Sequence, residues 1–203
     1  MARFLPPTPA FENVKLDIVR IGTGALFGRI LLGKYPDPLG FGKSRSRFSD
    51  PRRRVDRNRF GVLYLGRTLK VCFVEAVLRD ARNGAIGDFP FEEIEFRQRT
   101  YARIGVGAPL RLVDLRDDGR IRMGIPSDVT GAADQRAGRA WSLAIHDHPH
   151  QPDGLVYPSR LNNGTNLAIY DRAIAKLAPI RSYELLTAPG FADVLEELRV
   201  AIL

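Results

Sequence analysis

One carboxylate stands among apolar residues in the segment Cys72-Phe73-Val74-Glu75-Ala76-Val77-Leu78. Burying a carboxylate costs several kcal/mol unless it is paired or hydrogen-bonded, so an acid in this position indicates a site. Glu75 could hydrogen-bond a sugar hydroxyl or stabilise a developing cation. It could also be an exposed acid on the polar side of an amphipathic helix, but Val71, Val74 and Leu78 flank it on that side.

Arginines crowd the stretch upstream of this acid, at Arg45, Arg47, Arg52, Arg53, Arg54, Arg57 and Arg59. A guanidinium fork binds phosphate or carboxylate through two parallel hydrogen bonds, so these residues predict an anionic ligand. Arg47 is the candidate binding residue within the run. Arg20, at the end of the first predicted strand, could reach the same ligand. Each of the two could instead be a solvated surface residue.

Tyr64 and Ser159 are the other candidate site residues. Tyr64 precedes Glu75 across a predicted strand, turn and helix, a unit that can bring both side chains to one cleft. There its ring could stack on a flat ligand and its hydroxyl could donate a hydrogen bond, although a core aromatic also fits the pattern. Ser159 follows a predicted strand end, where a hydroxyl can contact a ligand, cap a helix or close a turn. No G-x-S-x-G elbow or placed base supports Ser159 as a nucleophile.

Metal and nucleotide motifs are not evident. The three histidines fall in His146-Asp147-His148-Pro149-His150, whose spacing matches no zinc signature and has no cysteine beside it, so no metal site is predicted. Gly22, Gly24 and Gly28 miss the dinucleotide fingerprint by one position, and its downstream acid is not evident. The sequence therefore argues against a Rossmann site, and no P-loop is present.

Composition and charge indicate a globular domain and limit the partners that it could have. The 203 residues are 44% hydrophobic, enough for one domain with a substantial core, and the formal charge is +8, from 31 Lys+Arg and 23 Asp+Glu. Such a surplus fits nucleic acid, a phosphate-bearing small molecule, an acidic protein partner or a plain solvated surface. No apolar run approaches the roughly 20 residues of a membrane helix, and the N-terminus lacks the apolar core of a secretory signal. The single Cys72 excludes an internal disulfide, so a cytoplasmic chain is predicted.

The elements that must position the candidate residues follow from apolar periodicity. Strands are predicted over residues 16–21, 60–65, 91–106, 110–115 and 154–158, and helices over 68–79, 136–146, 166–178 and 191–203. Residues 33–59 form an irregular segment that is long for a compact domain, and such segments are often functional. Strands and helices are interspersed without regular βαβ alternation, which favours the α+β class.

Five short regions, in order, carry a resemblance to a known family. They are Val19-Arg20-Ile21, Arg47-Phe48-Ser49-Asp50-Pro51, Gly61-Val62-Leu63-Tyr64-Leu65 with Cys72-Phe73-Val74-Glu75, Leu112-Val113-Asp114-Leu115, and Asp153-Gly154-Leu155-Val156-Tyr157-Pro158-Ser159. Together they resemble the RES domain, the toxin half of RES–Xre toxin–antitoxin systems. The arginine, glutamate and serine of that name would be Arg20 or Arg47, Glu75 and Ser159. Phe48 departs from the family, in which tryptophan is common after the second arginine.

The resemblance implies an α+β fold similar to ADP-ribosyltransferase toxins, a single domain with a small split β-sheet core and surrounding helices. It covers residues 15–185, with 1–14 as an N-terminal arm and 186–203 as a C-terminal helix packed on the domain or on a partner. It also implies a hetero-oligomer with an Xre-like antitoxin that carries a DNA-binding helix-turn-helix. Neither a membrane nor direct nucleic-acid binding is expected.

The implied reaction is breakage of the nicotinamide–ribose bond of NAD⁺, by hydrolysis or by phosphorolysis. The resemblance then gives Glu75, Arg20 and Tyr64 catalytic roles, with Arg47 and Ser159 binding the substrate. NAD⁺ is the substrate and no cofactor is required, although phosphorolysis would use inorganic phosphate as a co-substrate.

Three alternatives stay open. A mono-ADP-ribosyltransferase acting on a protein would use the same residues. A basic nucleic-acid-binding protein or RNase toxin would account for the arginine run and the charge, but no helix-turn-helix, zinc, RRM or KH pattern is present. A non-enzymatic partner-binding module could use the apolar stripe of residues 191–203 to dock a partner helix.

Overall fold

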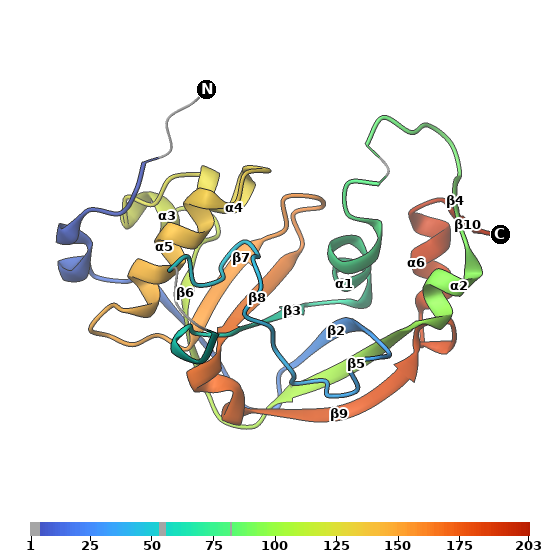
Figure 1. Ribbon diagram of the computed structural model, residues 1–203, viewed down its shortest axis with the longest axis horizontal. Coiled ribbons are helices and arrows are strands. Elements are labelled where there is room, and N and C mark those ends of the chain that lie inside the picture. Colours follow the sequence, from blue (N-terminus) through green and yellow to red (C-terminus); the bar gives the residue numbers. More distant parts are fainter. Residues whose placement is uncertain (1–4, 53–55, 82) are drawn as a thin grey trace.

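A curved mixed sheet runs through the chain in the strand order β1-β6-β7-β8-β3-β2-β5-β9 (Figure 1). Its strands are β1 (Ile18–Ile21), β2 (Leu26–Leu32), β3 (Val62–Gly66), β5 (Arg99–Val106), β6 (Leu110–Asp114), β7 (Gly154–Pro158), β8 (Thr165–Tyr170) and β9 (Leu177–Glu184). β6 and β7 pair in parallel, and the other neighbours pair in antiparallel. A separate parallel pair joins β4 (Phe89–Phe91) to β10 (Val200–Ile202).

The computed structural model describes residues 5–52, 56–81 and 83–203. Residues 1–4 of the predicted N-terminal arm, and Arg53 and Arg54 of the basic run, lie outside the described residues. Across the described ranges, every helix falls short of the length and apolar character that a bilayer crossing requires. The predicted single α+β domain is confirmed, although its sheet is larger than the small split core that was expected.

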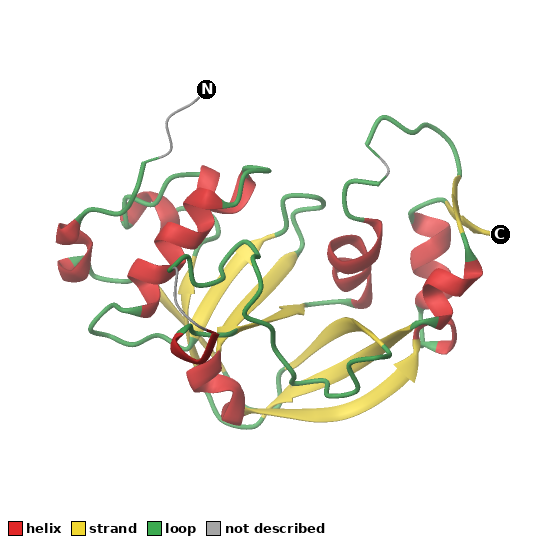
Figure 2. Ribbon diagram, viewed as in Figure 1, coloured by secondary structure: helices red, strands yellow, loops and turns green. Residues whose placement is uncertain are grey.

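Helices cover the two ends of the sheet (Figure 2). The α-helices are α1 (Leu69–Phe73), α2 (Glu93–Arg97), α3 (Gly119–Arg122), α4 (Asp128–Gly131), α5 (Arg136–His146) and α6 (Phe191–Glu197). Shorter turns are η1 (Pro9–Asn13), η2 (Asp56–Asn58), η4 (Asp171–Lys176) and η5 (Leu185–Thr187), while η3 (Val74–Leu78) is a π-helical turn that continues α1. In Figure 1, α3, α4 and α5 lie at one end of the molecule, and α1, α2 and α6 lie at the other.

Aromatic packing holds the C-terminal segment on the domain. Phe73 of α1, Phe96 of α2 and Phe191 of α6 meet pairwise with ring centroids 5.5 to 6.1 Å apart. All three side chains are buried, which makes α6 part of the core. The apolar stripe therefore packs inward over α6, whereas Ile202 and Leu203, which follow it, are exposed.

Several element predictions were wrong. The predicted helix over 166–178 is β8, η4 and the start of β9, because Leu167–Tyr170 is buried on both faces of the sheet. A strand covered on both faces has a continuous apolar run, which periodicity cannot separate from a buried helix. The last predicted helix ends at Glu197, and the chain then pairs as β10. Strand β2 was not predicted, and the predicted strand 91–106 contains α2 before β5.

Candidate active site

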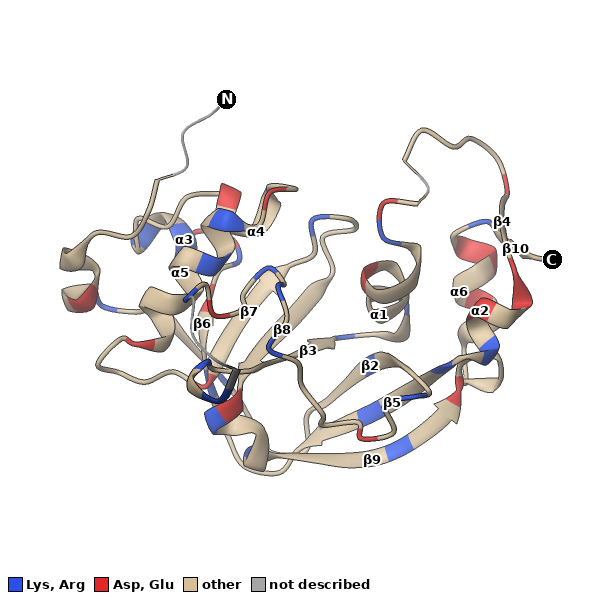
Figure 3. Cartoon of the chain, viewed as in Figure 1, with Lys and Arg blue, Asp and Glu red and all other residues tan. Residues whose placement is uncertain are grey.

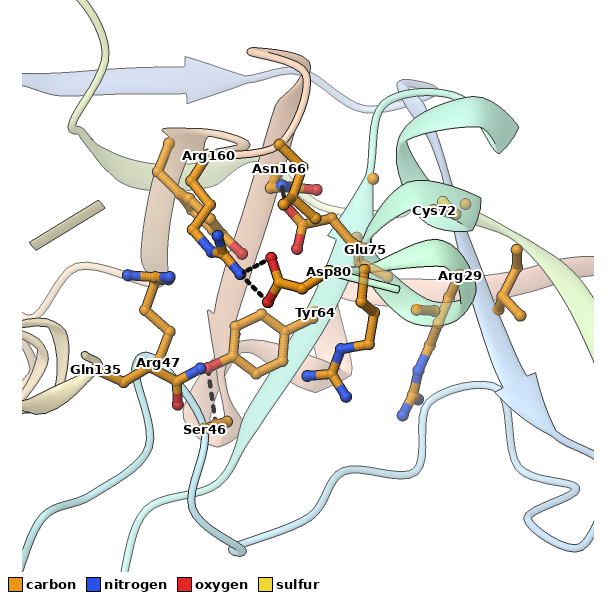
Figure 4. Close-up of a pocket in the computed structure, with 18 of the residues that line it drawn as sticks. Arg29, Ser46, Arg47, Tyr64, Cys72, Glu75, Asp80, Gln135, Arg160 and Asn166 are labelled. Carbon is orange, nitrogen blue, oxygen red and sulfur yellow. Dashed lines mark hydrogen bonds and ion pairs between the residues drawn. The ribbon is translucent and has the colours of Figure 1, made fainter. Parts of the chain in front are cut away.

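A cavity of about 530 Å³ opens between the end of α1, the loop that carries Arg47, and the β7–β8 loop (Figure 4). This volume lies within the range of roughly 300–1,000 Å³ that is usual for small-molecule sites. Among the described residues, its charged lining consists of five arginines and two carboxylates, namely Arg29, Arg45, Arg47, Arg79 and Arg160 with Glu75 and Asp80. The excess of guanidinium groups favours an anionic ligand.

Helix α1 brings Glu75 to this cavity. Thr68 caps the helix, because its side chain accepts a hydrogen bond from the backbone N–H of Val71 at 3.2 Å. The helix then widens into the π-turn η3, which contains Glu75. Single π-turns inside helices are rare and occur frequently at functional sites. The Glu75 carboxylate is half-buried and accepts a hydrogen bond from Nδ2 of Asn166 at 3.0 Å.

Tyr64 joins the sheet to the arginine loop. Its hydroxyl lies 2.9 Å from Oγ of Ser46 and accepts a hydrogen bond from the backbone N–H of Phe48 at 2.8 Å. Burial raises the pKa of Tyr64 to about 12, so the phenol is neutral at physiological pH. Tyr64 therefore both lines the cavity and fixes the loop next to Arg47.

Arg47 is held on the opposite wall from Glu75 (Figure 4). Its Nη1 donates to the carbonyl of Ala132 at 2.8 Å. Burial lowers the pKa of Arg47, and the nearby Glu75 carboxylate is among the groups that act against this. Arginine is so strong a base that its guanidinium stays charged in this setting, so Arg47 can bind an anion.

An ion pair crosses the mouth of the cavity. Nη2 of Arg160, in the β7–β8 loop, donates to both carboxylate oxygens of Asp80, which follows η3 (Figure 4). The hydrogen bond from Arg160 lowers the pKa of this exposed carboxyl. The pair joins the two sides of the opening, and an anionic ligand would compete with Asp80 for the guanidinium of Arg160.

Two predicted site residues lie away from the cavity lining. Arg20 is exposed on β1, at the edge of the sheet, opposite Arg111. Ser159 is fully buried, and its Oγ accepts the backbone N–H of Leu161 at 3.1 Å, which shapes the β7–β8 loop. Neither placement supports a direct contact with a ligand in the cavity.

Sequence reasoning missed several polar lining residues, Arg79, Asp80, Gln135 and Arg160 among them. Arg29 lies on β2, Tyr157 lies at the end of β7, and Asn166 lies near the start of β8. Arg29 donates to the carbonyl of Pro38 at 3.0 Å and so holds the irregular segment after β2. Asn166 is the cross-strand partner of Tyr157, and even a correct strand prediction for residues 165–170 would have left that pairing open.

The basic run divides into two parts. Arg45 and Arg47 line the cavity, whereas Arg52 forms a bidentate ion pair with Asp50 and Arg59 donates to the carbonyl of Asp50 at 2.9 Å. Basic positions are also spread over β5, β9, α3 and α5 (Figure 3). Within the part of the run that the structure describes, these four arginines are therefore engaged by the cavity or by Asp50 rather than by one continuous basic surface.

Asp50→Asn should destabilise the fold by about 2–3 kcal/mol, since it removes charge-assisted hydrogen bonds from a carboxylate that is 1% exposed. Burial alone would raise the pKa of Asp50. Hydrogen bonds from Arg52 and from the backbone N–H of Phe60 together have the larger, opposite effect, so the pKa in the folded protein lies below its ordinary value. The stabilisation is therefore present above about pH 4 and is lost as pH falls through the folded-state pKa.

Urea unfolding of both proteins between pH 7 and pH 3 checks this prediction. The difference in unfolding free energy should shrink toward pH 3. Asp134→Asn is the control, because Asp134 pairs with Arg136 on the surface and asparagine keeps the oxygen that accepts the backbone N–H of Arg136, so the change should matter little. An equal difference at both ends of the pH range would contradict the role given to Asp50.

The three histidines do not gather around a common point. His146 stacks on Phe60 with ring centroids 4.1 Å apart, and His148 lies 3.2 Å from the carbonyl of Val14. Burial lowers the pKa of both imidazoles. Within the described ranges, no group of three His, Cys, Asp or Glu side chains could hold a metal ion.

Three comparisons place the chain among known proteins. A relative, "Probable toxin y4kH" of Sinorhizobium fredii (strain NBRC 101917 / NGR234), is 42% identical over 100 residues, which is 49% of this chain and 79% of the relative. A chain in the crystal structure of the M. tuberculosis MbcT–MbcA toxin–antitoxin complex has the same fold, with a TM-score of 0.63 at 19% identity, covering 89% of this chain and 91% of that one. The family model of the RES domain matches residues 29–188, so this chain belongs to the RES domain family.

Proposed function

We propose that this chain is a toxin enzyme that degrades NAD⁺ by cleaving its nicotinamide–ribose bond. The observation that carries the proposal is the cavity itself, in which one half-buried carboxylate, Glu75, faces a wall of arginines. NAD⁺ offers the matching features, namely a pyrophosphate for the arginines and a ribose that gains positive charge during the reaction. The similarity to a probable toxin and to a chain of a toxin–antitoxin complex supports the toxin role.

Glu75 would act by electrostatic stabilisation. The bond between C1′ of the ribose and the ring nitrogen breaks, its electron pair goes to that nitrogen, and nicotinamide leaves as a neutral molecule. The ribose becomes oxocarbenium-like, and a fixed carboxylate lowers the free energy of that charge. Water or a phosphate oxygen then bonds to C1′, and water gives up one proton to solvent. No general acid is needed for the leaving group.

The arginines would hold the pyrophosphate. Arg47 is fixed by Ala132 and faces the cavity, while Arg160 is paired with the exposed Asp80 and can exchange that partner for a phosphate. Arg20 has no place in this scheme, since it lies on the exposed edge strand β1. Arg29 lines the cavity from β2 and would take the role that was expected of Arg20.

An antitoxin would neutralise the enzyme by covering the same opening. The structural relative was crystallised as a toxin–antitoxin complex, which supports a hetero-oligomer here as well. An Xre-like partner with a helix-turn-helix would supply the DNA-binding function, and the toxin chain itself would make no direct nucleic-acid contact.

A protein-directed mono-ADP-ribosyltransferase remains the second candidate. It would break the same bond with the same residues, and only the acceptor would differ. Mass analysis of the products separates the two, because transfer leaves ADP-ribose attached to a protein.

The test is to incubate the purified, antitoxin-free chain with NAD⁺, with and without inorganic phosphate, and to follow free nicotinamide. We expect release in at least one buffer. A phosphate requirement with a phosphorylated ADP-ribose product would identify phosphorolysis, and equal rates with free ADP-ribose would identify hydrolysis. A folded wild-type chain that releases no nicotinamide in either buffer would overturn the proposal.

A further inference from the structure

Asn166 occupies a central position beneath the cavity. It lies on β8 between two strands, paired with Gly66 on β3 and with Tyr157 on β7, and all three residues line the cavity. The side chain of Asn166 is 4% exposed, so it is fixed by packing on most sides. A buried amide must find hydrogen-bond partners, and its partners here show what it does.

A close approach of α1 to the sheet makes the contact with Glu75 possible. Gly66 faces α1, and a Cβ at this position would lie 2.7 Å from Sγ of Cys72 and 3.1 Å from its backbone nitrogen. The absence of a side chain at Gly66 therefore lets the helix sit against β3. Glu75 follows Cys72 by about one helical turn, so its carboxylate reaches over Gly66 to Asn166, the cross-strand partner of that glycine.

The hydrogen-bond pattern fixes which way the amide points. Only the amide nitrogen of Asn166 can donate to Oε1 of Glu75, at 3.0 Å, so Oδ1 must point elsewhere. Within residues 5–52, 56–81 and 83–203, no protein group donates a hydrogen bond to this Oδ1 or to Oε2 of Glu75. Both residues line the cavity, so each of these two oxygens can accept a hydrogen bond from a ligand there.

We propose that Asn166 is a positioning residue for Glu75, and that Oδ1 of Asn166 and the Glu75 carboxylate together accept hydrogen bonds from the two adjacent hydroxyls of a ribose. Two neighbouring acceptors match a vicinal diol, in which each hydroxyl donates once. The amide N–H also orients the carboxylate before the ligand arrives, which lowers the cost of organising it in the transition state. This inference rests on the proposed function, because it names the part of NAD⁺ that the pair would recognise.

The pair has several charged or titratable neighbours. They are Arg47 from the arginine loop, Tyr64 from β3, Cys72 from α1, Tyr157 from β7, and Arg79, Asp80 and Arg160 at the mouth. None of these side chains makes a hydrogen bond to Asn166 within the described ranges. A change at Asn166 therefore acts on Glu75 first.

The test compares Asn166→Ala and Asn166→Asp with the wild-type enzyme on NAD⁺ and on its 2′-deoxy and 3′-deoxy nicotinamide-ribose analogues. Asn166→Ala should lower kcat/KM for NAD⁺ about 10- to 100-fold, the effect of one lost hydrogen bond to a charged group. It should also abolish discrimination against one of the two analogues. Asn166→Asp puts a second carboxylate against Glu75, and two carboxylates in one site share a proton, so the acid limb of the pH–rate profile should move up by about 1–3 pH units.

Asn162→Asp is the matched control. Asn162 lies in the β7–β8 loop, and its Oδ1 accepts the backbone N–H of Gly164 at 3.0 Å, a role that aspartate keeps. The substitution adds the same charge four residues away without contact to Glu75, and the pH–rate profile should stay in place. A shift of equal size in both aspartate variants, or unchanged analogue discrimination in a folded Asn166→Ala, would overturn the inference.

A second readout does not depend on turnover. The ¹³C carboxyl signal of Glu75, assigned by its loss in Glu75→Gln, should respond to pH over a higher range in Asn166→Asp than in the wild type or in Asn162→Asp. If the wild type releases no nicotinamide but this signal responds as expected, the proposed function fails and the positioning role stands. If the signal is unaffected by Asn166→Asp, the positioning role fails whatever the activity.

Discussion

Glu75→Gln should reduce nicotinamide release by about 100- to 1,000-fold, the usual effect of removing one group that stabilises developing charge in a transition state. Glutamine keeps the shape of the side chain, and its carbonyl oxygen can still accept the amide of Asn166. The negative charge is lost, and one of the two acceptor oxygens is replaced by an amide nitrogen. The charge matters most in the transition state, so the loss should fall mainly on kcat and less on KM for NAD⁺. Initial-rate kinetics with a nicotinamide assay measure both constants.

Glu197→Gln controls for the removal of any carboxylate near this helix. Glu197 pairs with Lys70 of α1 on the surface, outside the cavity. Its substitution should leave turnover unchanged, because exposed ion pairs contribute little. If Glu75→Gln turned over NAD⁺ at a rate near that of the wild type, the role of Glu75 would be wrong even if the chain cleaves NAD⁺.

Gly138→Ala should weaken both the fold and the binding of an anionic ligand, although Gly138 lies on α5 and outside the cavity lining. A Cβ at Gly138 would lie 2.5 Å from the carbonyl oxygen of Arg47 and 3.1 Å from that of Val129. Backbone atoms cannot move aside cheaply, so the arginine loop must shift. Overpacking of this kind costs about 1–3 kcal/mol, and we expect KM for NAD⁺ to rise with it.

A loss of stability in Gly138→Ala would be informative, because alanine is the better helix former by about 1 kcal/mol and would by itself stabilise α5. Gly131→Ala is the control, at the end of α4, where a Cβ would have no neighbour within 4 Å. Urea unfolding and NAD⁺ kinetics on both variants test the prediction. A Gly138→Ala protein that is as stable as the wild type and binds NAD⁺ equally would show that α5 does not position the arginine loop.

Local patterns were enough to find the residues of the β3–α1 unit. Tyr64 and Glu75 lie on a strand and on the helix that follows it, and both periodicities are short-range signals that a sequence carries by itself. Arg47 was found through the chemistry of its run. All three residues do line the cavity, although their roles in a reaction stay a prediction.

Residues that depend on long-range pairing were not predictable in the same way. Asn166 reaches the cavity because β8 pairs with both β3 and β7, and the buried run after it was interpreted as a helix. Arg29 was missed with its strand. Arg20 was predicted from its place at the end of a strand, but the order of strands, which puts β1 at the edge of the sheet, is not a local signal. For Ser159 the position after a strand was predicted correctly, but burial and turn hydrogen bonds decide its orientation.

Nearly the whole of this chain must emerge from the ribosome during synthesis before the cavity can form. The strand that carries Tyr64 is completed on one side by β2 and on the other by β8, so the two walls come from opposite ends of the polypeptide. A nascent chain that stops after α5 contains Glu75 but neither Asn166 nor Arg160. Such domains generally fold as units. Truncated translation products of the proposed toxin would therefore be harmless to the cell that makes them.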